Sequence, residues 1–425
     1  GEFTGRLQMA KHSLRSWATL PRGSSEPRGF YYVSPVVNAL AVVMGNLGAA
    51  VHRDGYVKRL GFNRGRAYLS LRLRGDSCGA RKFCYDRCLT PLWGRFATRG
   101  NVLASEQLLS VLADGEFHSG EELGGLLGVS RAAVWKQLQK LEELSLSIEA
   151  QKGRGYRVVG GLDLLNRELI AQHTDQALQA ILEGMDIFGV LDSTNLQAAK
   201  RIAMGPAHQY CCTAEQQTAG RGRRGRQWLS PFGRSLYCSL VWEFSNGAAA
   251  LEGLSLCIGV AVANALSEAG VDGISLKWPN DVLLDGKKLG GILLEMQGDP
   301  AGVCQVIIGV GLNMQLQEVD SAVVTQPWAD LSAYPIGSDR NRMLALLLNA
   351  LFSALTQYSR KGFSPFRDQW QALDAFRGQS VKVQLGEEWL FGTEDGVNPD
   401  GGLRLITDSG VRVFHGGEVS LREVC

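Results

Sequence analysis

The sequence of 425 residues lacks the features of disulfide-rich, zinc-binding, collagen-like and membrane-spanning proteins. Its nine cysteines are too few for a disulfide scaffold, and Cys78, Cys84 and Cys88 lack the further ligands that zinc-ribbon spacing requires. The 52 glycines follow no collagen period, and no run of 18 or more strongly apolar residues occurs. We therefore expect reduced thiols, a cytoplasmic location, no protein-built metal site and no membrane partner.

Acidic residues are scarce in the first hundred positions, which hold 17 Lys and Arg against 5 Asp and Glu. The rest of the chain holds 27 Lys and Arg against 37 Asp and Glu. The net charge of +2 is therefore the sum of a basic N-terminal segment, the basic head, and an acidic remainder. The head is rich in Arg, Gly and Ser and has no sustained period. We interpret residues 1–102 as a basic extension that is disordered or non-native; an organelle-targeting segment and a nucleic-acid-binding arm are the alternatives.

Residues 103–165 predict a winged helix-turn-helix. A short amphipathic helix ends near Gly115, Ser119 and Glu122 form a capping box for a second helix, and Gly128 ends that helix. Ser130 begins a third helix, and two alternating runs around a Lys-Gly-Arg-Gly turn predict a hairpin. A module of this kind places its third helix in a DNA major groove, or serves only packing and dimer contacts. The exposed DNA-binding candidates are Arg131, Lys136, Gln137, Lys140 and Arg154.

Strands and helices alternate from Leu162 onward, which predicts a mixed α/β domain over residues 166–375. Apolar runs predict helices over 254–269 and 341–358. Four short alternating runs separated by turn residues predict a small SH3-like β-barrel over residues 376–425. The fold class is therefore α+β, with three domains after the extension. We expect strands at 187–191, 210–214, 235–243, 274–278, 288–296 and 303–313.

The segment from Gly220 to Arg226 holds four arginines and three glycines in seven residues. It satisfies the dinucleotide pattern G-x-G-x-x-G, but no helix follows to place its N-terminus at a pyrophosphate. Glycines let a loop close over a ligand, and arginine grips phosphate with two parallel hydrogen bonds. A local anion site is therefore favoured over a solvated basic loop or an RNA contact.

A second segment, from Lys277 to Glu295, predicts strands joined by turns at Pro279-Asn280 and Asp285-Gly286. This arrangement directs the side chains of Lys277, Asp281 and Lys288 toward the opening of one pocket. Together with the arginine-rich loop, these residues predict a pocket for a phosphorylated or carboxylated ligand.

Four segments in this order and spacing resemble the motifs of biotin protein ligases. They are Asp192-Ser193-Thr194-Asn195, the stretch from Glu215 to Trp228, Lys277-Trp278-Pro279-Asn280-Asp281 and Gly309-Val310-Gly311-Leu312-Asn313. The leading winged helix makes the sequence similar to the bifunctional bacterial type, which also represses biotin synthesis genes. The resemblance covers about residues 103–424, and the first hundred residues have no counterpart in it.

The resemblance implies a two-step reaction with ATP, biotin and Mg²⁺. Biotin is activated to biotinyl-5′-AMP, and a lysine of the biotin carboxyl carrier protein of acetyl-CoA carboxylase then takes the biotinyl group. It also implies binding to operator DNA and a homodimer favoured by the bound adenylate. The operator sequence and the affinities are not readable from the chain.

The resemblance also assigns roles to individual residues. The implied biotin contacts are Ser193, Thr194, Asn195, Gln217, Arg221, Gly222, Arg223 and Lys288. The implied ATP and adenylate contacts are Arg223, Arg226, Trp228, Lys288 and Asn313. The implied catalytic residues are Lys288, Arg223 and Asp281, of which Asp281 organises the lysines or Mg²⁺.

Three alternatives stay open at the sequence level. A lipoate–protein ligase would share the catalytic fold but need a longer, narrower apolar pocket. A non-catalytic ligand-sensing transcription regulator would have no turnover to lose when Lys288 is replaced. Nucleic-acid packaging by the basic head would give a steep salt dependence that survives removal of residues 103–425.

Overall fold

The computed structural model describes two compact units, residues 1–96 and residues 97–425. In the first unit it describes residues 55–63, 66–73 and 82–84. In the second it describes residues 101–423 except 145, 179–180, 182, 246, 248–250, 300, 317–325, 386–387 and 416–418. None of the helices in these ranges is long and apolar enough to cross a membrane.

The first unit contains a three-stranded antiparallel sheet in the order β1-β2-β3, made of Gly55–Asn63, Arg66–Leu73 and Lys82–Cys84. The sequence pattern indicates no such sheet. The rest of the basic extension lies outside the described residues, so its interpretation as disordered or non-native stays a prediction.

The winged helix-turn-helix consists of α3 (Asn101–Leu112), α4 (Gly120–Leu127), α5 (Arg131–Glu142) and the hairpin β4 (Ile148–Gln151) and β5 (Gly155–Val158). The capping box is present: the amide of Glu122 donates to the Ser119 hydroxyl, and the Glu122 carboxylate accepts from the Ser119 amide. Gly128 ends α4 in the left-handed region at φ 65°, and Ser130 caps α5. The structure therefore confirms the predicted capping box, the end of α4 at Gly128 and the start of α5 at Ser130.

A phenylalanine from outside the winged helix completes its hydrophobic core. Leu108, Leu123, Val134 and Val158 are fully buried in this cluster, and Phe232 joins them at 3% exposure. Phe232 follows the arginine-rich loop by a few residues. The segment after the loop is therefore anchored in the core of the winged helix.

A seven-stranded sheet forms the centre of the second unit, in the order β6-β7-β8-β12-β11-β10-β9. Only β6 and β7 pair in parallel; the other neighbours are antiparallel, so the sheet is mixed. The strands are β6 (Asp186–Leu191), β7 (Cys211–Gln217), β8 (Ser235–Phe244), β9 (Ile274–Lys277), β10 (Asp281–Leu284), β11 (Lys287–Gly298) and β12 (Cys304–Asn313).

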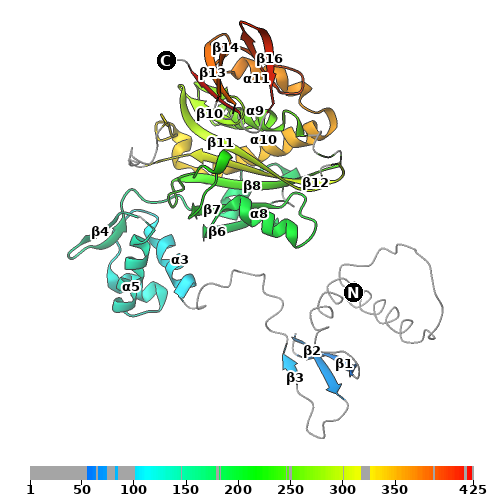
Figure 1. Ribbon diagram of the computed structural model, residues 1–425. Coiled ribbons are helices and arrows are strands. Elements are labelled where there is room, and N and C mark those ends of the chain that lie inside the picture. Colours follow the sequence, from blue (N-terminus) through cyan, green and yellow to red (C-terminus); the bar gives the residue numbers. More distant parts are fainter. Residues whose placement is uncertain are drawn as a thin grey trace, which may run out of the picture. The chain divides into compact units, whose positions relative to one another are not determined.

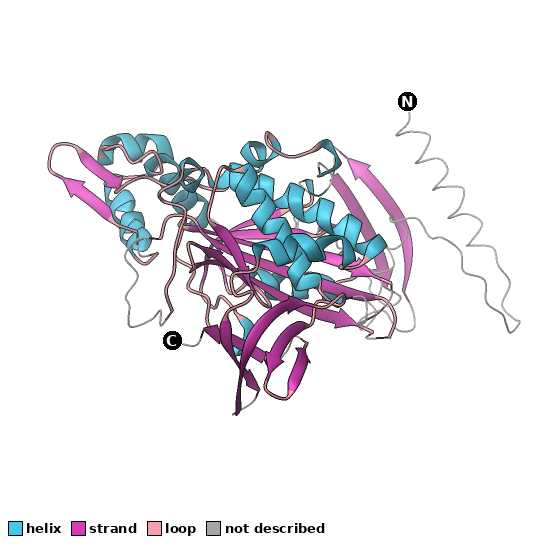
Figure 2. Cartoon of the chain, turned by 90° about the horizontal axis from the view of Figure 1, so that it is seen from above, coloured by secondary structure: helices cyan, strands magenta, loops and turns pink. Residues whose placement is uncertain are grey.

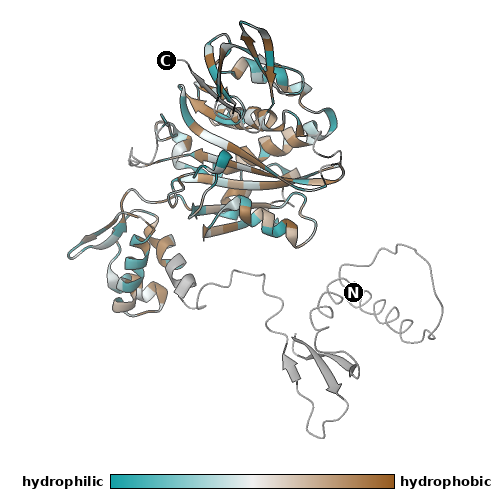
Figure 3. Ribbon diagram, viewed as in Figure 1, coloured by the Kyte–Doolittle hydropathy of each residue, from teal (hydrophilic) through white to brown (hydrophobic). Residues whose placement is uncertain are grey.

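Helices cover both faces of this sheet (Figures 1 and 2). On one face α9 (Leu254–Glu268) and α10 (Arg340–Lys361) pack against alternate residues of β8 such as Cys238 and Leu240. On the other face α8 (Thr194–Ala203) packs against Val241. Because both of its faces are covered, β8 is buried over nearly its whole length. The apolar residues of α9 are prominent when the chain is coloured by hydropathy (Figure 3).

Short elements complete the domain built on the seven-stranded sheet. They are α6 (Arg167–Ala171), η1 (Gln176–Leu178), η2 (Arg223–Gly225), η4 (Pro335–Ser338), η5 (Ser364–Phe366) and α11 (Arg367–Leu373).

A buried ion pair holds the linker after the winged helix against the domain built on the seven-stranded sheet. Arg340 at the start of α10 lies 2.6 Å from Glu215 of β7, and both residues are buried. The Arg340 guanidinium also donates to the backbone oxygen of Asp163, and Glu215 accepts the amide of Leu165 at 2.6 Å. Every charge is therefore partnered, as burial of an ion pair requires.

The C-terminal barrel has five strands: β13 (Ser380–Leu385), β14 (Glu388–Val397), β15 (Leu403–Thr407), β16 (Gly410–Phe414) and β17 (Val419–Glu423). Their order is β16-β15-β14-β13-β17. The sequence predicts four runs here. It misses β17, which pairs with β13.

A half-buried and a buried carboxyl group, those of Asp374 and Glu394, meet where the barrel joins the sheet. The segment at Asp374 pairs with Leu276 of β9, and Glu394 of β14 is 1% exposed. Burial first, and the adjacent Asp374 next, raise the pKa of Glu394 to about 8. Oδ2 of Asp374 and Oε2 of Glu394 accept no hydrogen bond from the other described residues. A Glu394 carboxyl that stays protonated at neutral pH avoids two like charges side by side.

The structure confirms the α+β fold class and the order of the elements. The strand predicted at 210–214 extends to Gln217, and β10 occupies the segment between the two predicted turns. The first turn of α8, which carries Thr194 and Asn195, has no strong sequence signal because its residues are polar and buried.

Candidate active site

A cavity of about 960 Å³ lies over β11 and β12 and is bounded by the arginine-rich loop, the turn after β9 and the barrel. Among the described residues that line it, seven side chains are cationic and one, that of Asp281, is a carboxylate. The cations are Arg221, Arg223, Arg224, Arg226, Lys277, Lys288 and Lys382. This excess of positive charge suits a ligand that carries several negative charges.

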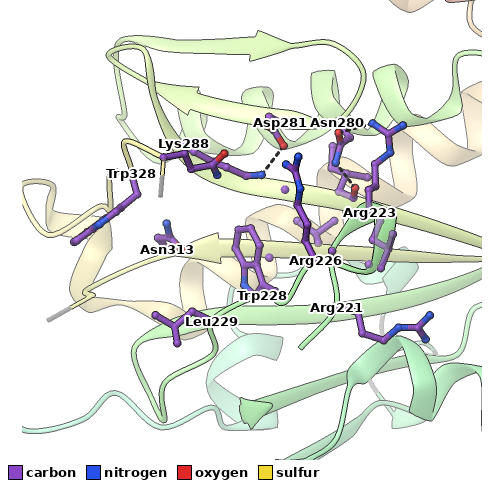
Figure 4. A pocket seen from close by; sticks show the side chains of 18 of the residues that line it. Arg221, Arg223, Arg226, Trp228, Leu229, Asn280, Asp281, Lys288, Asn313 and Trp328 are labelled. Atoms are coloured by element: carbon purple, nitrogen blue, oxygen red, sulfur yellow. Dashed lines mark hydrogen bonds and ion pairs between the residues drawn. The ribbon is translucent and has the colours of Figure 1, made fainter. Parts of the chain in front are cut away.

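The arginine-rich loop, hereafter the Arg-Gly loop (residues 220–228), is a closed hairpin. The amide of Trp228 donates to the Gly220 carbonyl at 2.9 Å, and the amide of Gly222 donates to the Arg226 carbonyl at 2.7 Å. These bonds place the loop across one side of the cavity (Figure 4).

Arg223 is the most enclosed arginine of the loop. Its guanidinium donates to the side-chain oxygen of Asn280 at 3.0 Å, and the Asn280 amide donates to the Ile292 carbonyl at 2.9 Å. Burial lowers the pKa of Arg223, Asp281 raises it, and Arg224 and Arg226 lower it. Asn280 therefore fixes the position of a buried cation, a role that its place in a sequence turn does not reveal.

Lys288 and Asp281 form an ion pair of 2.7 Å from neighbouring strands β11 and β10. Each side chain is 17% exposed, so the pair faces the cavity and not bulk water. In Figure 4 the side chain of Arg226 points to the side of the cavity where this pair lies. The sequence-predicted convergence of Lys277, Asp281 and Lys288 on one cavity is confirmed.

Trp228 lies flat on β12 because that strand carries glycine beneath it. A Cβ atom at Gly311 would lie 2.8 Å from the indole ring, closer than carbon atoms can pack. The ammonium of Lys288 lies 5.6 Å from the ring centroid. The buried indole Nε1 has no partner among the described residues. The ring thus offers a flat surface and a donor within the cavity lining.

Polar side chains with fixed hydrogen bonds line the part of the cavity near α8. The amide of Thr194 donates to the side-chain oxygen of Gln217 at 2.9 Å, and Gln217 donates to Ser230 at 3.0 Å. The buried Ser239 hydroxyl lies 2.6 Å from the side-chain oxygen of Asn195. These groups are held in place before any ligand arrives, which suits recognition of a polar ring.

Two further segments reach the cavity. Trp328 pairs with Lys288 through the bonds Lys288 N to Pro327 O (3.1 Å) and Ala329 N to Lys288 O (2.9 Å). Asn313 donates to the Ala329 carbonyl at 3.0 Å. From the barrel, Phe376 and Lys382 line the opposite wall. The barrel is therefore part of the site.

The structure brings all of the predicted small-ligand residues to this one cavity. They are Ser193, Thr194, Asn195, Gln217, Arg221, Gly222, Arg223, Arg226, Trp228, Asp281, Lys288 and Asn313. Their individual roles stay predictions. Sequence reasoning assigns no role to the lining residues Asn280, Trp328, Phe376 and Lys382, or to Ser239 and Glu295 behind the cavity. Asn280 and Glu295 lie in the singled-out segment from Lys277 to Glu295, but an asparagine in a turn and a carboxylate at a strand end have ordinary structural explanations; the other four lie outside the charged and glycine-rich segments.

The predicted DNA-binding residues lie on α5 and on the wing. Arg131, Lys136, Lys140 and Arg154 are exposed. Gln137 is half-buried with its side-chain oxygen covered, which corrects the expectation that it is exposed; it adjoins the face of Val134 and Leu138 that packs on the core. Sequence analysis missed Trp135, 51% exposed on the same helix.

The described residues contain no cluster of three or more His, Cys, Asp or Glu that could hold a metal ion. Cys211, Cys212, Cys238, Cys257 and Cys304 are free and buried. Burial raises the pKa of Cys257, as it does for Cys304.

Fold and site together define a winged helix-turn-helix joined to an anion-binding catalytic domain and a small barrel. The family models that match are "HTH domain" over residues 105–157, "Biotin/lipoate A/B protein ligase family" over 188–313 and "Biotin protein ligase C terminal domain" over 376–422.

Known proteins match the same region. The "Bifunctional ligase/repressor BirA" of Escherichia coli is 40% identical over 316 residues, 74% of this chain and 96% of that protein. The "Biotin--[acetyl-CoA-carboxylase] ligase" of Paracoccus denitrificans is 35% identical over 54% of this chain and 96% of its own. The structure of the Aquifex aeolicus biotin protein ligase in complex with biotin and ATP is 30% identical, covers 57% of this chain and all of that one, and has a TM-score of 0.50. The chain belongs to the biotin protein ligase family, in its bifunctional ligase/repressor form.

Proposed function

We propose that the chain activates biotin with ATP to biotinyl-5′-AMP and transfers the biotinyl group to a lysine of a biotin carboxyl carrier protein. The observation that carries the proposal is the division of one cavity into two parts. Fixed polar groups at Thr194, Asn195 and Gln217 suit the biotin ring, and the cluster of Arg and Lys side chains suits a triphosphate. A volume of about 960 Å³ accommodates both.

In the first step, a carboxylate oxygen of biotin attacks the α-phosphorus of ATP. The new C–O–P bond forms as the bond to the β-phosphate breaks, and pyrophosphate leaves. This step brings two anions together, so cations that are already in place lower its barrier more than groups that must reorganise. Lys288, held at 2.7 Å from Asp281, and Arg223, held at 3.0 Å from Asn280, are such cations.

In the second step, the neutral amine of a carrier lysine attacks the mixed anhydride, and AMP leaves. The leaving group is already activated, so correct placement of the amine is the main requirement. Trp228 and the Arg-Gly loop enclose the cavity on the side where the adenylate would lie. Enclosure keeps water from hydrolysing the anhydride before the carrier arrives.

Mg²⁺ fits the cavity as an ion carried chiefly by the substrate. Among the described residues that line the cavity, Asp281 is the only one with a carboxylate, and it already pairs with Lys288. Mg²⁺ in nucleotide sites is commonly held by one or two carboxylates, phosphate oxygens and water. Asp281 would provide the protein ligand, and the ion would offset phosphate charge.

The winged helix supports a second activity, repression of biotin synthesis genes through operator DNA. Exposed Arg131, Lys136 and Lys140 on α5 and Arg154 on the wing suit contacts to phosphates and base edges. A homodimer favoured by the bound adenylate would place two such modules on paired half-sites. Free buried cysteines agree with a cytoplasmic location.

Incubating the full chain with ATP, labelled biotin and a biotin carrier domain tests the proposal. Biotin on the carrier lysine, with AMP and pyrophosphate released in equal amounts, is the expected result. A parallel reaction with lipoate serves as the specificity control. Preference for lipoate, or binding of biotin without any turnover, would overturn the assignment in favour of a lipoate ligase or a ligand sensor.

A further inference from the structure

Glu295 of β11 contacts two of the predicted ligand-binding residues without lining the cavity itself. Its Oε2 accepts the side-chain amide of Asn195 at 2.8 Å, and its Oε1 lies 2.7 Å from the guanidinium of Arg221. Asn195 belongs to the first turn of α8, and Arg221 belongs to the Arg-Gly loop. One carboxylate therefore joins the polar wall of the cavity to the loop that crosses it.

Glu295 also decides how the Asn195 amide is oriented. The Asn195 side-chain oxygen lies 2.6 Å from the Ser239 hydroxyl, and its nitrogen faces Glu295 and, at 3.4 Å, the Leu293 carbonyl. A Cβ atom at Gly309 would lie 2.2 Å from the Asn195 oxygen, so the side chain fills its space completely. A hydroxyl on one side and a carboxylate on the other leave the buried amide a single orientation.

The ion pair between Glu295 and Arg221 ties the Arg-Gly loop to β11. The guanidinium of Arg221 is directed away from the Lys288–Asp281 pair, as Figure 4 shows. Side-chain exposure is 49% for Arg221 and 27% for Glu295. An ion pair this accessible contributes little to global stability. It can still restrain the loop, as a second side-chain contact beside the bond from Arg223 to Asn280.

We propose that Glu295 is a positioning residue that clamps the Arg-Gly loop over the biotin end of the cavity through Arg221 and orients Asn195 for the ring. The inference rests on the proposed ligase function for its ligand. The clamp itself exists in the protein without ligand. Glu295 touches neither substrate nor reacting atoms, so its loss affects loop closure and biotin retention more than the chemical step.

The test compares Glu295→Gln, Arg221→Gln, the double variant and Glu295→Ala in the full chain. Glu243→Gln on β8, whose carboxylate accepts from Gln305 outside the cavity, is the matched control. The first measurement needs no ligand: tryptic cleavage after the exposed Arg224, followed by mass spectrometry. We expect Glu295→Gln and Arg221→Gln each to speed this cleavage about two- to five-fold. The double variant should equal either single variant.

The second measurement is the dissociation rate of biotinyl-5′-AMP together with KM for biotin and kcat for adenylation. Glu295→Gln should release the adenylate about two- to five-fold faster with kcat little changed. Glu295→Ala also removes the oxygen that accepts the side-chain amide of Asn195, so this variant should raise KM for biotin about tenfold. Additive effects of the Glu295 and Arg221 substitutions, or cleavage and release at the parent rates, would overturn the clamp. A parent that forms no adenylate refutes the ligase function instead, and the cleavage result still decides on the clamp.

Discussion

Lys288 and Asp281 show how single residues prepare the cavity for an anionic reaction. Their ion pair is largely shielded from water, so its charges act at short range in a medium of low polarity. When phosphate approaches Lys288, the ammonium is already in position and needs no reorganisation. The sequence predicts the types of these residues and their convergence. It does not predict Asn280, which fixes Arg223, because an asparagine in a turn has an ordinary structural explanation.

Replacing Lys288 by Met tests this role. The substitution keeps the length of the side chain but removes the charge, so we expect kcat for adenylation to fall about 10²–10³-fold, as for loss of one preorganised electrostatic contact. The neighbouring Lys287→Met is the matched control, since Lys287 is exposed and does not line the cavity. Pyrophosphate release in single-turnover mixing measures both. Equal rates for the two variants would contradict the assignment.

The raised pKa of Glu394 leads us to expect that the stability of the folded chain depends on pH. Its pKa of about 8 exceeds the ordinary value of 4.5, because burial and Asp374 disfavour its ionised form. The folded state therefore binds more protons than the unfolded state between these values, and the contribution of Glu394 to stability decreases as pH rises from about 4.5 to about 8.

Glu394→Gln, which stays neutral, should lose this contribution. The melting temperature of the variant relative to the parent should rise between pH 5 and pH 8, measured by calorimetry. Glu388→Gln, exposed on the same strand, is the control and should follow the parent. A difference between variant and parent that is constant over this range would refute the raised pKa.

At the scale of elements, the ligand surface depends on where β12 has no side chains. Gly309 and Gly311 alternate with buried Val310 and Leu312, so their missing Cβ atoms leave space on one face. Asn195 fills the first space and Trp228 covers the second. The sequence predicts the strand and its glycines. It cannot predict their partners, which come from segments more than 80 residues away in the chain.

Gly311→Ala should move Trp228 off the sheet, because the new methyl group would lie 2.8 Å from the indole ring. Overpacking of this kind typically costs about 1–3 kcal/mol, so we expect KM for ATP to rise about tenfold. Gly189→Ala on β6 is the control, since a methyl group there meets open space. Steady-state adenylation at varied ATP measures the effect; an unchanged KM would show that Trp228 does not contact the nucleotide.

At the scale of the whole molecule, a side chain from the segment after the Arg-Gly loop belongs to the core of the DNA-binding module. Phe232 is buried in the winged-helix core and follows the Arg-Gly loop by a few residues. The sequence predicts each domain from its own pattern: capping residues for the winged helix, alternating strands for the barrel. It does not predict the contacts between them, such as Phe232 or Arg340 with Glu215, because these depend on packing between distant segments.

Lys136→Ala tests the DNA interface of the whole chain. If Lys136 contacts one phosphate, the slope of log affinity against log salt should decrease by about 0.9 on a mixed-sequence duplex. Lys361→Ala, a cation at the end of α10, is the control and should leave the slope unchanged. Fluorescence anisotropy at several salt concentrations gives the slope. If both variants give the same slope of log affinity against log salt, Lys136 does not contact the DNA.

The central claim is that one cavity makes a biotin–AMP anhydride and keeps it until a protein amine arrives. The most direct measurement is to incubate the protein with ATP and labelled biotin without an acceptor, remove free ligands by gel filtration and analyse what stays bound. The account predicts about one equivalent of biotinyl-5′-AMP per cavity, discharged on addition of a carrier domain. Bound biotin and ATP that remain unreacted, or an adenylate that leaves with the solvent fraction, would contradict it.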